Sequence, residues 1–187
     1  MFKFNKHIRN VLISFLPLAV VITALCGLIY VTLHQNYRQT ANDPQIQLAE
    51  DVIKEIEGGQ DSTAFIPTRK LDLASTLATY IMVFDDKGKL LGTSVTLDGK
   101  DPVVPSGVFD VTKQKGETRF TWEPKKGVRN ALVVKYYKGN ISGFIGVGRS
   151  LREVEKREFM LAKTVALGWI LTLGASFLSL LYFSKVK

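Results

Sequence analysis

The stretch TYIMVFDDKGKLLGTS, from Thr79 to Ser94, contains two apolar runs separated by a polar turn. The first run is rich in branched and aromatic residues, which are typical of strands, and the second run begins at Lys89. The intervening sequence, Asp85-Asp86-Lys87-Gly88, has the composition of a tight turn. Because strands joined by a tight turn are antiparallel neighbours, the stretch predicts a β-hairpin.

Three further strands are predicted closer to the C-terminus, at residues 117–124, 128–137 and 141–150. Lys125-Lys126-Gly127 and Lys138-Gly139-Asn140 separate them, and both have the composition of turns. Consecutive strands connected in this way pair antiparallel. Together with the first hairpin, they predict a sheet of five antiparallel strands.

Three stretches are predicted to be helical: residues 44–57, 71–79 and 106–115. The first has apolar residues at helical spacing on one face, and Gly58-Gly59 can end it. Because such a face must be covered, the predicted class is α+β, a five-stranded antiparallel sheet with flanking helices. We expect the helix at 106–115 and the loop at Pro102 and Pro105 to cover the other face, as a lid over a small cavity.

Two uncharged apolar segments, Val11–Leu33 and Thr164–Phe183, bracket this predicted domain. Each is long enough for a helix to cross the ~30 Å hydrocarbon core of a bilayer. A cleaved signal peptide is the alternative for the first segment. Its apolar run exceeds the usual 7–15 residues and no A-x-A site follows it, so we expect an uncleaved anchor.

Basic residues at both ends of the chain predict the orientation. Lys3, Lys6 and Arg9 precede the first segment, and Lys185 and Lys187 follow the second. Lys and Arg close to span ends favour the cytoplasmic side. The predicted organisation is a cytoplasmic N-terminus (1–10), a first span (11–33), an extracytoplasmic domain (34–160), a second span (161–183) and a cytoplasmic C-terminus (184–187). The protein is thus expected in the cell membrane, in contact with the lipid bilayer.

The composition argues against several function classes. The net charge of +8 is partly explained by these terminal residues, and no basic stripe suggests nucleic-acid binding. The single cysteine, Cys26, lies in the first span, and both histidines lie beside that span. We therefore expect no metal site and no cofactor. No catalytic residues are predicted and no enzymatic activity is expected, because both histidines flank the first span and no Ser or Cys has a recognisable partner.

The order of these elements, with a span on each side, resembles the extracytoplasmic PAS-like sensor domains (single Cache or PDC type) of bacterial histidine kinases and chemoreceptors. The resemblance is carried by three stretches, TYIMVFDDKGKLLGTSVTLDGKDPVVPSGVF, GETRFTWEPKKGVRNALVVKYY and GFIGVGRSLREVEKRE. It covers roughly residues 34–160. It implies a PAS/Cache-like sheet and a sensing role. A kinase of this type would continue after the second span into its output domains, whereas this sequence reaches Lys187 without one.

A ligand site is the first candidate function of the domain. Arg119, Arg129 and Lys135 could hold an anion such as a carboxylate beside the aromatic walls of Trp122 and Tyr136. Surface charges that flank ordinary core aromatics explain the same residues. The sequence leaves both interpretations open.

Small residues recur at four-residue spacing in both spans. Ala19, Thr23 and Gly27 share one face of the first span, and the second carries the corresponding series Gly168, Thr172 and Ser176. Such stripes let helix backbones approach closely in lipid. They predict helix pairing within the chain, in a homodimer or with another membrane protein, and chance explains them as well.

The last strand leads into a charged helix. Ser150 and Glu153 form a capping-box pattern, and Arg157 lies one turn beyond Glu153. No proline interrupts the sequence from there to its end, so one helix can extend from the domain through the second span. This helix is either a simple stalk or a signalling lever.

Two functions are therefore expected. The first is a two-pass membrane protein with an extracytoplasmic sensing or binding domain, which lacks its own output domain and acts through a membrane partner such as a separate histidine kinase. The alternative is a ligand-free interaction or assembly module, or the remnant of a truncated sensor kinase.

Overall fold

The computed structural model describes residues 6–138 and 141–186. Lys3, Lys187 and the predicted turn residues Gly139 and Asn140 lie outside these ranges. The chain divides into two compact units, a central unit of residues 38–155 and a terminal unit of residues 1–37 with 156–187.

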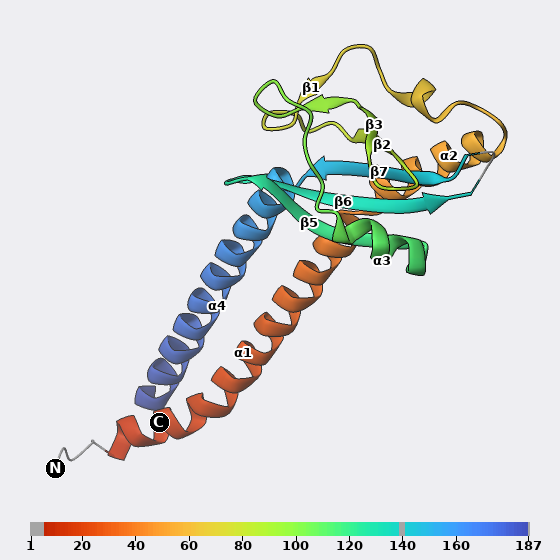
Figure 1. The fold of residues 1–187 in the computed structure, drawn as a ribbon. Coiled ribbons are helices and arrows are strands. Elements are labelled where there is room, and N and C mark those ends of the chain that lie inside the picture. Colours follow the sequence, from red (N-terminus) through yellow and green to blue (C-terminus); the bar gives the residue numbers. More distant parts are fainter. Residues whose placement is uncertain (1–5, 139–140, 187) are drawn as a thin grey trace. The chain divides into compact units, whose positions relative to one another are not determined.

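The terminal unit is a pair of long helices, α1 (Lys6–Thr40) and α4 (Arg152–Val186). The two helices lie side by side and antiparallel (Figure 1). Contacts between them in this register include Phe15 with Phe177, Thr23 with Trp169, and His34 with Glu158. Both helices are long and apolar enough to cross a membrane.

The central unit is built on a five-stranded antiparallel sheet. Its strands are β2 (Tyr80–Asp85), β3 (Leu90–Thr93), β5 (Glu117–Lys125), β6 (Val128–Tyr137) and β7 (Gly143–Ser150). Their spatial order is β3-β2-β7-β6-β5, so the last strand of the chain lies at the centre of the sheet (Figure 1). The predicted α+β class and the antiparallel five-stranded sheet are confirmed.

Glycines in β7 allow large side chains to lie on the centre of the sheet. A Cβ atom at Gly148 would meet the ring of Tyr80, and a Cβ atom at Gly146 would lie 3.2 Å from the ring of Phe84. Tyr80 and Phe84 are almost completely buried there. The glycines therefore provide the room that the aromatic core requires.

Helix α2 (Asp43–Glu57) covers one face of the sheet, which confirms the helix predicted at 44–57. Its buried face packs against side chains of β2, β6 and β7, and the cluster contains Ala49, Val52, Ile56, Ile81, Val83, Tyr137, Ile145 and Val147. A short 3-10 helix, η1 (Ser62–Phe65), follows α2 and was not predicted.

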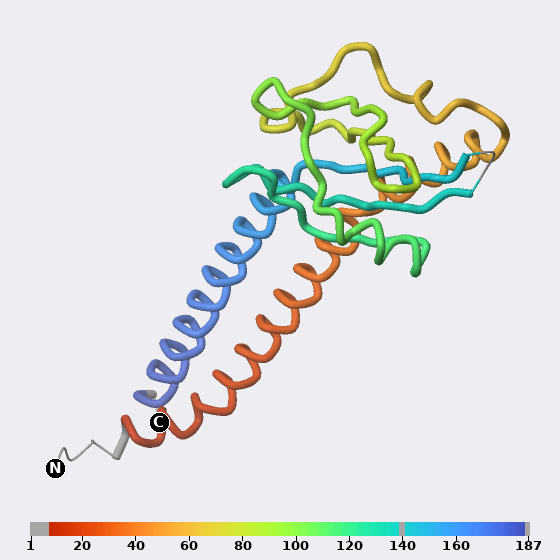
Figure 2. Tube along the Cα trace, in the orientation of Figure 1, coloured from red at the N-terminus to blue at the C-terminus, as the bar shows by residue number. Residues whose placement is uncertain are grey.

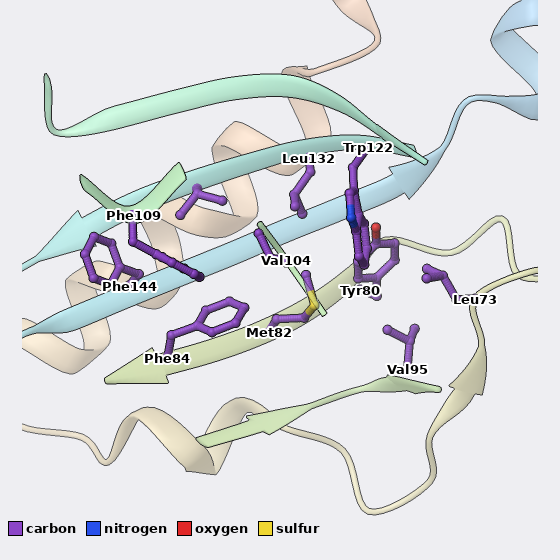
Figure 3. Close-up of a cluster of buried hydrophobic side chains, with 11 residues drawn as sticks. Leu73, Tyr80, Met82, Phe84, Val95, Val104, Phe109, Trp122, Leu132 and Phe144 are labelled. Atoms are coloured by element: carbon purple, nitrogen blue, oxygen red, sulfur yellow. The ribbon is translucent and has the colours of Figure 1, made fainter. Parts of the chain in front are cut away.

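The opposite face is covered by α3 (Gly107–Lys115) and by the segment that leads into it from β4 (Val95–Thr96). Figure 2 shows this segment crossing the sheet on its way to α3. Val104 of the segment enters a cluster of buried side chains (Figure 3), which consists of Leu73, Tyr80, Met82, Phe84, Val95, Val104, Phe109, Trp122, Leu132, Val134 and Phe144. The predicted helix at 106–115 is confirmed, and so is its position on this face.

The helix predicted at residues 71–79 is wrong. β1 (Leu71–Asp72) pairs in parallel with β4, and the carboxylate of Asp72 then accepts a hydrogen bond of 3.1 Å from the amide of Ala74. Asp, Ser and Thr compete with helical hydrogen bonding by closing local turns of this kind. Leu73 is buried beside this turn, so tertiary packing holds the segment in its non-helical conformation.

Substitution Gly148→Ala tests the role of the central glycines. The added methyl group must displace the buried ring of Tyr80, so we expect unfolding in denaturant to show a loss of about 1–3 kcal/mol. Gly107→Ala is the control, because a Cβ atom there meets nothing within 4 Å. Equal stability of Gly148→Ala and the unaltered protein would contradict this account of β7.

Candidate functional site

The structure separates the five residues predicted to bind a ligand. Arg119, Arg129 and Lys135 occupy positions of β5 and β6 on the face that α2 covers. Trp122 and Tyr136 belong to the other face, where Trp122 is buried in the core and Tyr136 packs against it. The sheet therefore lies between the predicted cations and the predicted aromatic walls, and the five do not line one pocket.

Each of the three predicted cations has carboxylate partners. Arg119 pairs with Glu117, Arg129 pairs with Glu155 and lies 3.8 Å from Glu123, and Lys135 bridges Glu50 (2.6 Å) and Glu117 (3.1 Å). The two arginines are well exposed, whereas the Lys135 side chain is only 15% exposed. Exposed pairs contribute little to stability, so Lys135 is the structurally important cation of the three.

Lys135 lies in a groove of about 500 Å³ between α2 and the β5–β6 side of the sheet. We call it the Lys135 groove. It is lined by four carboxylates and two ammonium groups, namely Glu50, Asp51, Glu57 and Glu117 with Lys54 and Lys135. Its field is therefore negative overall, and it suits a polar ligand that carries a cationic group.

Partial burial and ion pairing act in opposite directions on the groove's central pair. Burial lowers the pKa of the Lys135 ammonium, but its hydrogen bonds to Glu50 and Glu117 outweigh burial and raise that pKa above its ordinary value. Burial raises the pKa of Glu117, but hydrogen bonds from Arg119 and Lys135 lower it overall. Both groups are therefore held in their charged forms near neutral pH.

Sequence reasoning missed a second polar cluster on the opposite face. The Lys113 ammonium of α3 donates to Asp86 at 2.7 Å, and the Tyr136 hydroxyl donates to the same carboxylate at 2.9 Å. These hydrogen bonds lower the pKa of Asp86. The turn composition around Asp86 was recognisable, but partners 27 and 50 residues away could not be read from it. The cluster fixes the β2–β3 turn to α3.

Apolar side chains occupy the face beneath the Pro102/Pro105 loop. Val104, Phe109 and Trp122 are buried there in one cluster (Figure 3). Two polar atoms, the Tyr80 hydroxyl and Asn130 Oδ1, are buried in the same region without a hydrogen-bond partner among the described residues. Burial also raises the pKa of the Tyr80 hydroxyl.

The small-residue stripe of α1 faces α4. Thr23 Oγ1 accepts a hydrogen bond of 2.9 Å from the indole of Trp169, and Gly27 lines an apolar groove of about 380 Å³ between the two helices. Ala19 is half-buried on the same face. Thr23 is therefore the residue of this stripe with a direct bond to α4, whereas Gly27 is exposed and a Cβ atom there would meet nothing within 4 Å.

The stripe of α4 is only partly used in this way. Ser176 is half-buried, whereas Gly168 and Thr172 are exposed, and a Cβ atom at Gly168 would meet nothing within 4 Å. Thr172 donates its hydroxyl hydrogen bond to the Gly168 carbonyl of its own helix. Val165 and Trp169 contact the groove on α1 instead. Gly168 and Thr172 thus remain open to another helix.

The start of α4 is attached to two parts of the central unit. The Leu151 amide donates to the Arg129 carbonyl of β6 at 2.9 Å, and the Arg152 guanidinium donates to the Ser75 carbonyl at 3.0 Å. The Arg129 side chain also pairs with Glu155 in the first turn. β7 therefore leads into a helix whose first turn is held by β6 and by the turn after β1.

The predicted cap of this helix has different partners. The Ser150 hydroxyl accepts from the Arg152 amide at 3.3 Å, and the first helical bond begins at Leu151. Within the described part of the chain, no hydrogen bond returns from Glu153 to Ser150 and no ion pair joins Glu153 to Arg157. The N-cap residue is thus Leu151, one residue later than the Ser150 that the sequence pattern indicates.

Metal binding has no obvious site in the structure. Among residues 6–138 and 141–186, no group of three His, Cys, Asp or Glu side chains is placed to hold a metal ion. The carboxylates of the Lys135 groove are instead arranged around an ammonium group.

Substitution Glu117→Gln tests the ionic pair of the Lys135 groove. Because the folded-state pKa of Glu117 is lowered, its ionised form stabilises the fold above the unfolded-state value of 4.5, and this stabilisation is lost as the pH falls through the folded-state pKa. We expect the melting temperature of Glu117→Gln to fall less between pH 6 and pH 3 than that of the unaltered protein.

Glu55→Gln is the matched control, because Glu55 is an exposed glutamate on α2. Its melting temperature should follow that of the unaltered protein across the same range. An identical acid dependence of Glu117→Gln and the unaltered protein would show that the pair contributes nothing.

The sequence was compared with protein families and with curated proteins. No family model matches it, and no curated protein is significantly similar to it. The inference of function therefore rests on the Lys135 groove, the helix pair and the attachment of α4.

Proposed function

We propose that this chain is a two-pass membrane protein whose central unit is an extracytoplasmic PAS/Cache-like binding module. The attachment of α4 is the observation that carries the proposal. The helix begins at Arg152, with only Leu151 between it and β7, and has no break before Val186. A change in the sheet that moves β6 or β7 acts directly on the first turn of a membrane-spanning helix.

The antiparallel helix pair supports the proposed orientation. Arg9 near the start of α1 and Lys185 near the end of α4 lie at the same end of the pair, because the helices run in opposite directions. Lys3, Lys6 and Lys187 add basic residues at these two chain ends. Basic residues beside spans favour the cytoplasm, which leaves the central unit on the outer side.

The Lys135 groove is the proposed binding site. Its walls come from α2 on one side and from β5 and β6 on the other. Only Ala41 and Asn42 separate α2 from α1, and only Leu151 separates β7 from α4. A ligand that replaces the Lys135–Glu50 bond would change how α2 is held against the sheet, and these are the elements that continue into the two spans.

The exposed face of α4 is the proposed route to a partner. Gly168 and Thr172 offer a surface on which a second helix can approach closely, which is a leading source of helix association in lipid. The partner would be a separate histidine kinase or another membrane protein. In this role the chain transmits a signal laterally through helix contacts.

An interaction or assembly module without a small-molecule ligand is the second candidate. The filled core beneath the Pro102/Pro105 loop favours it, because a ligand cavity was expected there. Such a module would use the exposed face of α4 but would not depend on Lys135.

Substitution Gly168→Leu tests the proposed lateral contact. The larger side chain should prevent close helix approach, so we expect a cross-linked complex with the membrane partner to disappear. Gly174→Leu is the matched control, because it lies six residues further along and hence about 240° around the helix. A complex that survives Gly168→Leu, or that is lost equally in both variants, would contradict a partner site at this face. A Lys135→Met variant that retains normal signalling would favour the assembly module.

A further inference from the structure

Strand β5 forms one edge of the sheet, with β6 as its neighbour on the inner side. The Gly116 carbonyl accepts a hydrogen bond from the Tyr136 amide, which fixes the phase of the β5–β6 ladder. In an antiparallel ladder, every second residue of a strand bonds the same neighbour. The backbone N–H and C=O groups of residues 118, 120 and 122 are thus directed toward β6. Those of residues 117, 119, 121 and 123 are directed toward the free edge.

The exposed positions of this edge form a charge pattern that is complementary to itself. The strand reads ETRFTWEPK, with Thr121 at its centre. When two copies are aligned antiparallel about Thr121, Arg119 of each copy lies opposite Glu123 of the other. The register shift between Trp122 and Lys125 takes Lys125 out of this alternation, and Lys125 pairs with Asp98 instead. Directly opposed residues project on the same face, so each Arg119 meets a Glu123 carboxylate at a cross-strand position.

The aromatic residues follow the same symmetry. Phe120 lies opposite Trp122 in this alignment, on the face that contains the core of the central unit. Trp122 is buried in its own core, so Phe120 is the aromatic side chain that remains partly exposed along this edge. A random edge strand would place like charges opposite one another in some registers, whereas this register opposes no like charges.

Two features of β5 are compatible with edge pairing. Pro124 lies where the β5–β6 register shifts, between Trp122 and Lys125, so its missing amide does not interrupt the free edge from Glu117 to Glu123. Arg119, Thr121 and Glu123, the central positions of the alignment, are all exposed.

The existing ion pairs of these residues do not prevent this pairing. Arg119 pairs with Glu117 of its own strand, and Glu123 lies 3.8 Å from Arg129. Because exposed pairs of this kind are weak, their charges can exchange partners at little cost.

We propose that two copies of this chain associate through β5, with the strands antiparallel about Thr121. The interface is isologous, as in most symmetric dimers, because the same residues contribute from each copy. It joins the two sheets into one continuous sheet. The interface is independent of the exposed face of α4, so a dimer at β5 and a partner at Gly168 can exist together.

A charge exchange tests the proposal on the full-length protein in detergent and in lipid nanodiscs, with the mass measured by light scattering. We expect the unaltered chain to be a dimer and Arg119→Glu to be a monomer at the same concentration, because Arg119→Glu opposes two carboxylates. The double variant Arg119→Glu with Glu123→Arg restores opposite charges and should restore the dimer. A monomeric unaltered chain, a dimeric Arg119→Glu or a monomeric double variant would each overturn the proposal.

A disulfide experiment tests the register itself. In a Cys26→Ser background, Thr121→Cys should form an intermolecular disulfide on mild oxidation, since directly opposed, hydrogen-bonded residues have Cα atoms about 5.5 Å apart. Leu91→Cys, an exposed position on strand β3 at the opposite edge, is the control and should remain reduced. Equal cross-linking at both positions would indicate random collision and would exclude this register.

Circular dichroism and melting temperature identify any variant that fails to fold. The Gly168→Leu variant, in turn, should leave the dimer unchanged. Loss of the dimer in Gly168→Leu but not in Arg119→Glu would place the contact between copies in the spans and overturn the β5 proposal.

Discussion

The central position of β7 is the constraint on which the rest of the structure depends. This strand pairs with β2 on one edge and β6 on the other, so it joins the first hairpin to the second. Such a strand must accept large side chains of its neighbours, and on the face opposite α2 the missing Cβ atoms of Gly146 and Gly148 make room for Phe84 and Tyr80. Since β7 also precedes α4, the same strand connects the hydrophobic core to the second apolar helix.

Much of the fold could be predicted because its signals are local. The Asp85–Gly88 turn, the apolar face of α2 and the uncharged segments of α1 and α4 are each contained in a short stretch of sequence. The pairing of β2 with β7 joins residues about sixty positions apart, and no periodicity reports it. The parallel pairing of β1 with β4 is equally non-local, and it overrode the helical pattern at residues 71–79.

The candidate site was less accessible to sequence reasoning. Lys135 and Tyr136 were expected to share a site, but as neighbours on β6 they lie on opposite faces of the sheet. The partners of Lys135 come from α2 and β5 and depend on tertiary packing. A carboxylate on a distant helix cannot be assigned to a lysine from sequence alone. The same limit applies to the small-residue stripes, because spacing identifies a face but not its neighbour. Thr23 faces Trp169, whereas Gly168 faces away from α1.

The central claim is that two antiparallel spans hold the sheet domain outside the membrane with both chain ends inside. Labelling of single cysteines with a membrane-impermeant maleimide tests it most directly, in a Cys26→Ser background. Ser106→Cys in the central unit and Lys185→Cys near the end of α4 are both exposed positions. The account predicts that Ser106→Cys is labelled in intact cells and Lys185→Cys only after lysis. Labelling of Lys185→Cys in intact cells, or protection of Ser106→Cys, would contradict it.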